Sequence, residues 1–179
     1  IPLRSADRAE LTPLVFAGMV APSVEELSPQ RRERFLHYGR VYKDFIRPLL
    51  PTCRMYHHEP VNARGGVESS PWFATEYAAP DRSAGWATII RMVNGAGQSF
   101  RHVYHNEVVS DSDVAQPAEF RQHTYIFVPR GLDPARTYHV TYDSIGTTAT
   151  VDGLRLLQEG IPVRLENAGM SELLLFQEA

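Results

Sequence analysis

Short apolar runs separated by turn residues fill residues 123–165. The three runs cover 125–128, 138–142 and 161–165. Residues that favour turns stand between them, namely Gly131, Asp133, Pro134, Asp143, Ser144, Gly146, Asp152, Gly153 and Gly160. Within 138–142, tyrosine and valine alternate with histidine and threonine, a period of two that places one face of a strand in a core. The pattern predicts antiparallel strands joined by tight turns.

Residues 29–46 carry the clearest helical pattern in the chain. Ser28 can cap the first turn, and proline suits the first helical position. Apolar side chains then recur at helical spacing, at Phe35, Tyr38, Tyr42, Phe45, Ile46 and Leu49. The helix is expected to end at residue 46, because Pro48 disfavours helical geometry in the residue before it. An amphipathic helix of this kind needs a surface on which its apolar side can pack. That surface is either the sheet of this chain or a domain outside it.

The rest of the chain reads mainly as strands. Further strands are expected at 53–58, 72–77, 86–92, 99–104 and 171–176. The polar segment 106–120 is expected to be an exposed loop, and 152–158 a turn or short helical piece. About eight short strands predict a mainly β fold, an antiparallel β-sandwich preceded by a helical segment. We expect two regions, a helical segment over 1–50 and a β-sandwich domain over 51–179.

Charge and hydropathy narrow the range of partners. The 179 residues include 18 basic and 21 acidic side chains, which gives a net charge of −3. This balance offers no electrostatic attraction for nucleic acid or for an anionic membrane surface. No apolar run approaches the ~20 residues that a membrane-spanning helix needs. We therefore expect neither nucleic acid nor a membrane as a partner.

The chain has one cysteine, Cys53, so no disulfide can form within it, and zinc-binding spacing is absent around this residue. A small buried hydrophobe is the favoured role for Cys53. A lone cysteine slightly favours a reducing compartment such as the cytoplasm. The first residue is Ile1 rather than methionine, so we expect the sequence to be part of a longer polypeptide. We expect no cofactor and no metal.

No common catalytic motif is present. Gly95 and Gly97 lack the third glycine, the lysine and the following helix of a phosphate-binding loop. His57 and His58 are neighbours on a predicted strand and would point to opposite faces, so they cannot easily share a metal.

Two groups of titratable side chains offer weaker hypotheses. His102 and His105 diverge along a predicted strand, but with His123 they could support a small independent enzyme. Glu59 and Glu76 could form a carboxylate pair at the ~5 to ~9 Å separation that glycosidases use. In both cases the ordinary interpretation, polar or half-buried side chains without a catalytic role, is favoured. No residue of this chain is therefore assigned as catalytic.

Trp72 and Trp86 are the candidates for carbohydrate binding. An exposed indole offers a flat apolar face with a polar edge, on which a sugar ring can stack. The competing interpretation is that both residues fill the core, as aromatic side chains in strands usually do. That interpretation is favoured for both, and more strongly for Trp86, which begins the apolar run 86–90.

Several segments, taken in order, resemble one family of glycoside hydrolases. Residues 35–50 (FLHYGRVYKDFIRPLL) are similar to the last barrel helix of the melibiase-type α-galactosidases of glycoside hydrolase families 27 and 36. The segments that look like the family's next hairpin, its GLDP turn and its closing strands are 72–77 with 80–83, 131–138, 153–161 and 171–173. The resemblance covers most of residues 23–179.

The resemblance implies a (β/α)8 barrel upstream and a C-terminal antiparallel β-sandwich in this chain. Residues 1–50 would then be the end of the barrel. Members of the family are retaining enzymes with two catalytic aspartates at the ends of barrel strands, which would precede residue 35. No catalytic residue can be carried onto this chain, so we expect the chain alone to be inactive.

Two functions follow as hypotheses. The resemblance favours a non-catalytic accessory domain of an α-galactosidase-like glycoside hydrolase, which packs on and stabilises the upstream catalytic barrel of the same polypeptide. The alternative is a carbohydrate-binding β-sandwich module that uses an exposed Trp72 or Trp86 to bind an oligosaccharide. The exposure of the two indoles separates the hypotheses.

Overall fold

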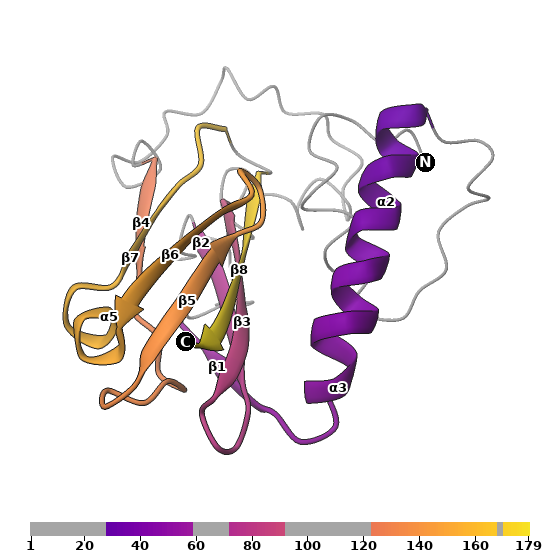
Figure 1. The fold of residues 1–179 in the computed structure, drawn as a ribbon. Helices are drawn as coiled ribbons and strands as arrows, with labels where there is room; N and C mark the ends of the chain where they lie inside the picture. The colour runs from indigo at the N-terminus through magenta and orange to yellow at the C-terminus, as the bar shows by residue number, and fades with distance from the viewer. Residues whose placement is uncertain (1–27, 59–71, 92–122, 168–169) are drawn as a thin grey trace, which may run out of the picture.

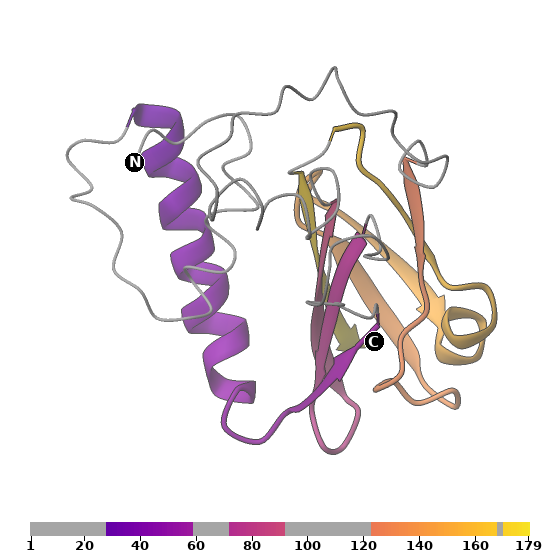
Figure 2. The ribbon, with the colours of Figure 1, turned by 180° about the vertical axis from the view of Figure 1, so that it is seen from behind.

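The computed structural model describes residues 28–58, 72–91, 123–167 and 170–179. These residues form three layers, namely a helix, a six-stranded sheet, and a two-stranded sheet with a short helix (Figure 1, and from behind in Figure 2). The elements are α2 (Pro29–Val41), η2 (Tyr42–Ile46), α3 (Arg47–Leu49), β1 (Arg54–His57), β2 (Trp72–Ala78), β3 (Ala84–Arg91), β4 (Thr124–Phe127), β5 (Thr137–Tyr142), β6 (Thr147–Asp152), α5 (Gly153–Glu159), β7 (Ile161–Arg164) and β8 (Ser171–Glu178). The predicted mainly β fold with a preceding helical segment is confirmed.

The first helix runs further than the sequence predicted. α2 continues through η2, one turn of π-helix, in which the Arg47 N–H donates to the carbonyl of Tyr42 five residues earlier. Pro48 has no N–H to donate, and in an α-helix its ring crowds the carbonyl four residues before it. The wider π-turn relieves this crowding, so the helix continues to Leu49. The expected end at residue 46 was therefore wrong.

The large sheet is antiparallel throughout, in the order β1-β2-β3-β8-β5-β6. Strand β8, the last of the described strands, lies between β3 and β5 and pairs with both. Strands β4 and β7 form the second sheet, also antiparallel. The large sheet is covered by α2 on one face and by β4, β7 and α5 on the other (Figures 1 and 2). Side chains on both faces of β3 and β8 are therefore buried. This explains why their sequences are mostly apolar and do not alternate between apolar and polar residues.

Two hydrophobic clusters lie on the two faces of the large sheet. Between the sheet and the helix, Trp86 and Leu173 pack with Tyr38 and Ile46. The larger cluster joins the inner faces of the two sheets and contains Trp72 with aliphatic and aromatic residues of both. The apolar stripe of the helix thus finds its partner in the sheet of this chain, which is one of the two alternatives that the pattern left open.

The predicted strands that fall on described residues are present, with ends shifted by a few residues. β6 was missed, because its sequence TTATVD is mostly exposed and lacks an apolar alternation. α5 confirms the short helical piece that was one expectation for 152–158. The predicted strand 99–104 and loop 106–120 lie outside the described residues, as do residues 1–27. The division into two regions at residue 50 stays a prediction.

Candidate functional site

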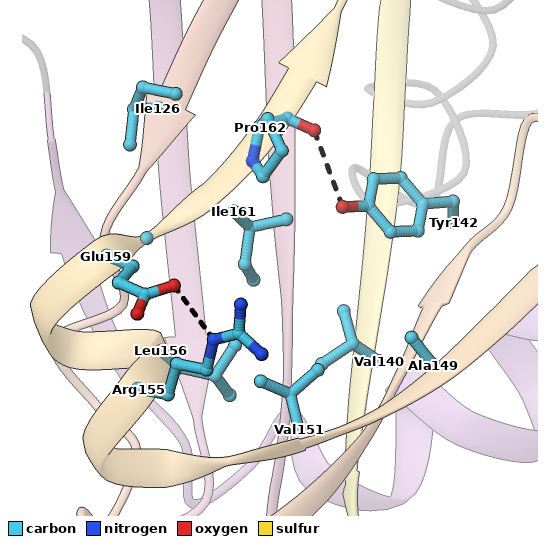
Figure 3. Close-up of a pocket in the computed structure, with 11 residues that line it drawn as sticks. Ile126, Val140, Tyr142, Ala149, Val151, Arg155, Leu156, Glu159, Ile161 and Pro162 are labelled. Carbon is cyan, nitrogen blue, oxygen red and sulfur yellow. Dashed lines mark hydrogen bonds and ion pairs between the residues drawn. The ribbon is translucent and has the colours of Figure 1, made fainter.

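A hollow of about 400 Å³ opens between the β5–β6 hairpin, α5 and the β4–β7 sheet (Figure 3). We call it the β5–α5 groove. Its lining is mainly aliphatic, with Val140, Val151, Leu156 and Ile161 among the residues that contribute. Figure 3 shows Arg155 and Glu159 on one side and Tyr142 on the other. The groove therefore combines an apolar floor with polar groups at its edges.

Each polar group of the groove is held by a defined contact. Arg155 Nε donates to Glu159 Oε2 over 2.8 Å, one helical turn apart on α5. This hydrogen bond to the carboxylate, with its charge, raises the pKa of Arg155. The Tyr142 hydroxyl donates to the carbonyl oxygen of Pro162 at 3.4 Å. Burial of its ring, followed by the charge of Glu172, raises the pKa of Tyr142.

A glycine positions the helix that carries the charged pair. Gly160 ends α5 with φ 72° and ψ −173°, a conformation that essentially only glycine adopts. A Cβ atom at this position would lie 2.6 Å from Cγ2 of Ile126. Gly160 therefore lets the chain turn from α5 into β7 while staying in contact with β4.

The structure buries both tryptophans. Trp72 is 5% and Trp86 1% exposed, and they lie in different clusters on opposite faces of the large sheet. Trp86 stacks on Tyr77 with ring centroids 4.7 Å apart, and Trp72 packs against Tyr125 at 5.5 Å. Neither indole presents the open face that sugar stacking requires. Carbohydrate binding at these two residues stays a prediction, and their burial argues against it.

Glu76 is buried and hydrogen-bonded within the fold. Its carboxylate is fully buried and accepts the backbone N–H groups of Arg130 and Gly131, each over 2.8 Å. His58 Nε2 lies 2.8 Å from the same carboxylate. A Cβ on Gly131 would lie 2.3 Å from Cβ of Ala78, so this close approach requires glycine. We call Glu76, His58 and the Arg130–Gly131 backbone the Glu76 clasp. It ties β2 to the residue that follows β1 and to the loop after β4.

The histidines and Glu59, which the sequence analysis considered for catalysis or metal binding, do not form one site among the described residues. His58 is nearly buried whereas His57 is exposed, consistent with their predicted divergence. His123 Nδ1 lies 2.9 Å from a guanidinium nitrogen of Arg91. Glu59, His102 and His105 lie outside the described residues, so the pairs and clusters predicted with them are untested.

The described residues contain neither a cluster of metal ligands nor a helix able to cross a membrane. Within 28–58, 72–91, 123–167 and 170–179, no three histidine, cysteine, aspartate or glutamate side chains gather closely enough to hold a metal ion. In the same part of the chain, no helix has the length and apolar character needed to cross a bilayer.

Sequence reasoning missed the β5–α5 groove. The available signal was the Arg155–Glu159 spacing of four residues, which brings the two side chains together on a helix. Nothing in the sequence placed that pair opposite Tyr142, because their proximity depends on how the hairpin and the second sheet pack.

The fold has counterparts among solved structures. The α-galactosidase from Lactobacillus brevis matches with a TM-score of 0.59 and 14% identity, over 88% of this chain and 18% of that chain. A GH36 α-galactosidase from Geobacillus stearothermophilus, in complex with raffinose, matches with a TM-score of 0.56 and 14% identity, over 88% of this chain and 17% of that one. This chain has the fold of a part of the GH36 α-galactosidases.

A further solved structure gives the same result. The galactosidase domain of an α-galactosidase–sucrose kinase matches with a TM-score of 0.55 and 14% identity, over 87% of this chain and 17% of that one. Neither a protein-family model nor a curated protein matches the sequence. The chain spans less than a fifth of the length of these α-galactosidase chains. The predicted resemblance is confirmed at the level of the fold.

Proposed function

We propose that this chain is a non-catalytic accessory portion of an α-galactosidase-like glycoside hydrolase, a hydrolase of carbohydrate metabolism. In this proposal it packs on and stabilises a catalytic barrel of the same polypeptide. The observation that carries the proposal is coverage, because the fold of this chain makes up only 17–18% of the α-galactosidase chains that contain it. The single cysteine favours the cytoplasm as the compartment.

The buried acids support a structural role. Glu76 is held in the Glu76 clasp. Glu172, also buried, accepts the backbone N–H of Ser144 at 2.8 Å and the Ser144 hydroxyl. Buried carboxylates that accept hydrogen bonds from their own chain stabilise the fold, which supports a structural role for both.

The surface that meets the barrel cannot be the apolar stripe of the helix. That stripe packs on the sheet of this chain, so it no longer argues for an external partner. The outward side of α2 carries Arg32, Leu36 and Arg40 at intervals of four residues, all exposed. Leu36 is 47% exposed between the two arginines. We place the contact with the barrel on this stripe, which we call the outer α2 stripe.

Hydrolysis of a chromogenic α-galactoside tests the proposal. The chain alone is expected to be inactive, and the polypeptide that contains it active. Turnover by the chain alone would overturn the non-catalytic role, and Glu76 would then be the first residue to replace.

A pair of variants tests the packing. Leu36→Glu is expected to shorten the half-life of α-galactosidase activity on heating the whole polypeptide, without changing the thermal midpoint of this chain alone. Leu154→Glu is the matched control, because Leu154 is 52% exposed on α5, in the opposite layer. An equal loss in both variants, or in neither, would contradict a contact through the outer α2 stripe.

A further inference from the structure

The β5–α5 groove has features that packing on a barrel does not require. Its volume of about 400 Å³ lies within the roughly 300–1,000 Å³ that small-molecule sites occupy. Such sites combine apolar walls with a few polar groups that fix the orientation of the ligand. The groove has this composition, with an aliphatic floor, one phenol and one ion pair.

The ion pair offers a donor and an acceptor side by side. Arg155 uses Nε to reach Glu159, and in Figure 3 its two terminal nitrogens extend from α5 towards Ile161 and Val151. Glu159 contributes a carboxylate, which is purely an acceptor. Neighbouring hydroxyl groups on a ligand can accept from the guanidinium and donate to the carboxylate. Charge-assisted hydrogen bonds are stronger than neutral ones, although solvent screens them here, because Arg155 is 67% and Glu159 62% exposed.

The charges also select against an anion. Glu159 lies 2.8 Å from Arg155, so the local charge sums to about zero. An anionic ligand would be attracted by Arg155 and repelled by Glu159 to a similar degree. The pair therefore suits a neutral ligand that carries several hydroxyls.

The opposite side of the groove suits the apolar face of a ring. The Tyr142 hydroxyl makes a long hydrogen bond, 3.4 Å, to the carbonyl oxygen of Pro162, which favours this orientation of the phenol. Val140 and Ile161 are buried beneath the groove, whereas half-buried Tyr142 and exposed Ile126 and Pro162 line its accessible part. These three residues offer an apolar surface to carbon-bound hydrogens. An aromatic ring with a polar end binds well where a ligand is apolar on one face and hydroxylated at its edge.

We propose that the β5–α5 groove binds a neutral saccharide unit. The Tyr142 ring, with Ile126 and Pro162, contacts the carbon-bound hydrogens of the sugar ring, and Arg155 and Glu159 bind two neighbouring hydroxyls. The site is separate from Trp72 and Trp86, and it is independent of whether the chain packs on a barrel.

Titration of the full chain, followed by proton–nitrogen correlation NMR, tests the site. Galactose and raffinose are the saccharide probes, sorbitol is an open-chain polyol, and acetate is an anion. Saturable shifts are expected at Val151, Arg155 and Gly160 with a saccharide, with weaker binding of sorbitol and none of acetate. Absence of saturable shifts with both saccharides, shifts confined to another surface, or tighter binding of acetate would overturn the proposal.

Variants connect the binding to the named side chains. Arg155→Met keeps the aliphatic stem and Glu159→Gln keeps the shape. Each is expected to weaken saccharide binding about three- to tenfold, the loss of one solvent-screened hydrogen bond. Tyr142→Phe keeps the ring and should bind nearly as well, whereas Tyr142→Leu should not. Arg164→Met is the matched control, because it removes an exposed ion pair with Glu166 on β7. An equal loss of affinity in this control would overturn the assignment.

Discussion

At the scale of single residues, two glycines set how closely the layers approach. Gly131 allows the Glu76 clasp to close against Ala78, and Gly160 allows α5 to turn beside Ile126. Turn residues at both positions were evident in the sequence, which predicted the turns themselves. The contacts made across those turns could not be predicted, because they join segments distant in the chain. Glu76 and His58 were both noticed in the sequence, but their pairing was not.

Gly160→Ala is expected to destabilise the chain by roughly 1–3 kcal/mol, the cost of a backbone conformation that L residues avoid, and more if the Cβ clash with Ile126 is not relieved. Gly39→Ala is the opposing control, since Gly39 is helical and has open space around it. It should stabilise the chain by about 0.5–1 kcal/mol. Urea denaturation measures both variants. A Gly160→Ala variant as stable as the unchanged chain would contradict the conformation described for Gly160.

Glu76→Gln tests the Glu76 clasp. A glutamine amide can accept only one of the two backbone N–H groups with its oxygen, so its NH2 group faces the other donor. We expect a loss of roughly 1–3 kcal/mol in the free energy of unfolding. Glu178→Gln is the control, because Glu178 pairs with Arg136 at the surface and should change stability by under ~1 kcal/mol. A loss no larger than in the control would show that the clasp contributes little.

At the scale of elements, apolar patterning predicted the strands that are buried and missed the one that is not. β8 (SELLLFQE) is buried along most of its length, and its apolar run marked it clearly. β6 carries threonines on an edge of the sheet, and such a sequence resembles a loop. The end of the first helix was misplaced because a π-turn accommodates Pro48, and a single-residue rule does not include that possibility.

Ile46→Ala is expected to weaken the attachment of the helix to the sheet. Ile46 is 1% exposed at the π-turn, within the cluster that contains Trp86. Truncation of a buried isoleucine to alanine costs ~2–5 kcal/mol. Leu36→Ala, on the exposed side of the same helix, should cost less than about 0.5 kcal/mol. Thermal unfolding compares the two variants, and similar midpoints would contradict the packing of the helix on the sheet.

At the scale of the whole molecule, the family resemblance predicted the kind of fold but not the order of its strands. The position of β8 between β3 and β5 follows from pairings across long stretches of sequence. Local patterning shows that a strand is buried on both faces, but it does not identify its neighbours. The β5–α5 groove depends on the same long-range arrangement, which is why the sequence did not reveal it.

Stability is expected to fall in alkaline solution. Burial raises the pKa values of Tyr77, Tyr138 and Tyr142. The folded state therefore keeps these phenols neutral after the unfolded chain begins to ionise near pH 10. Their contribution is complete below about pH 10 and is lost as the pH rises through the raised values. Urea midpoints at increasing pH, with tyrosinate absorbance recorded in parallel, measure the effect.

A substitution at Tyr77 measures how much this residue contributes to the loss of stability in alkaline solution. Tyr77→Phe should flatten the pH dependence, because Tyr77 then has no proton to lose. Burial also raises the pKa of Cys53, whose charge acts on Tyr77, so the comparison is made in a Cys53→Ser background. Identical pH profiles with and without the Tyr77 hydroxyl would contradict its contribution.

The central place of β8 has a consequence for how the chain is made. A ribosome releases residues 171–178 after every other described strand, yet these residues join β1–β3 to the β5–β6 hairpin. The two halves of the sheet therefore cannot unite while translation is still under way upstream of β8. A polypeptide cut short before β8 would expose two unpaired strand edges, on β3 and on β5, and such edges promote aggregation. The six-stranded sheet can therefore be completed only after residues 171–178 have been synthesised.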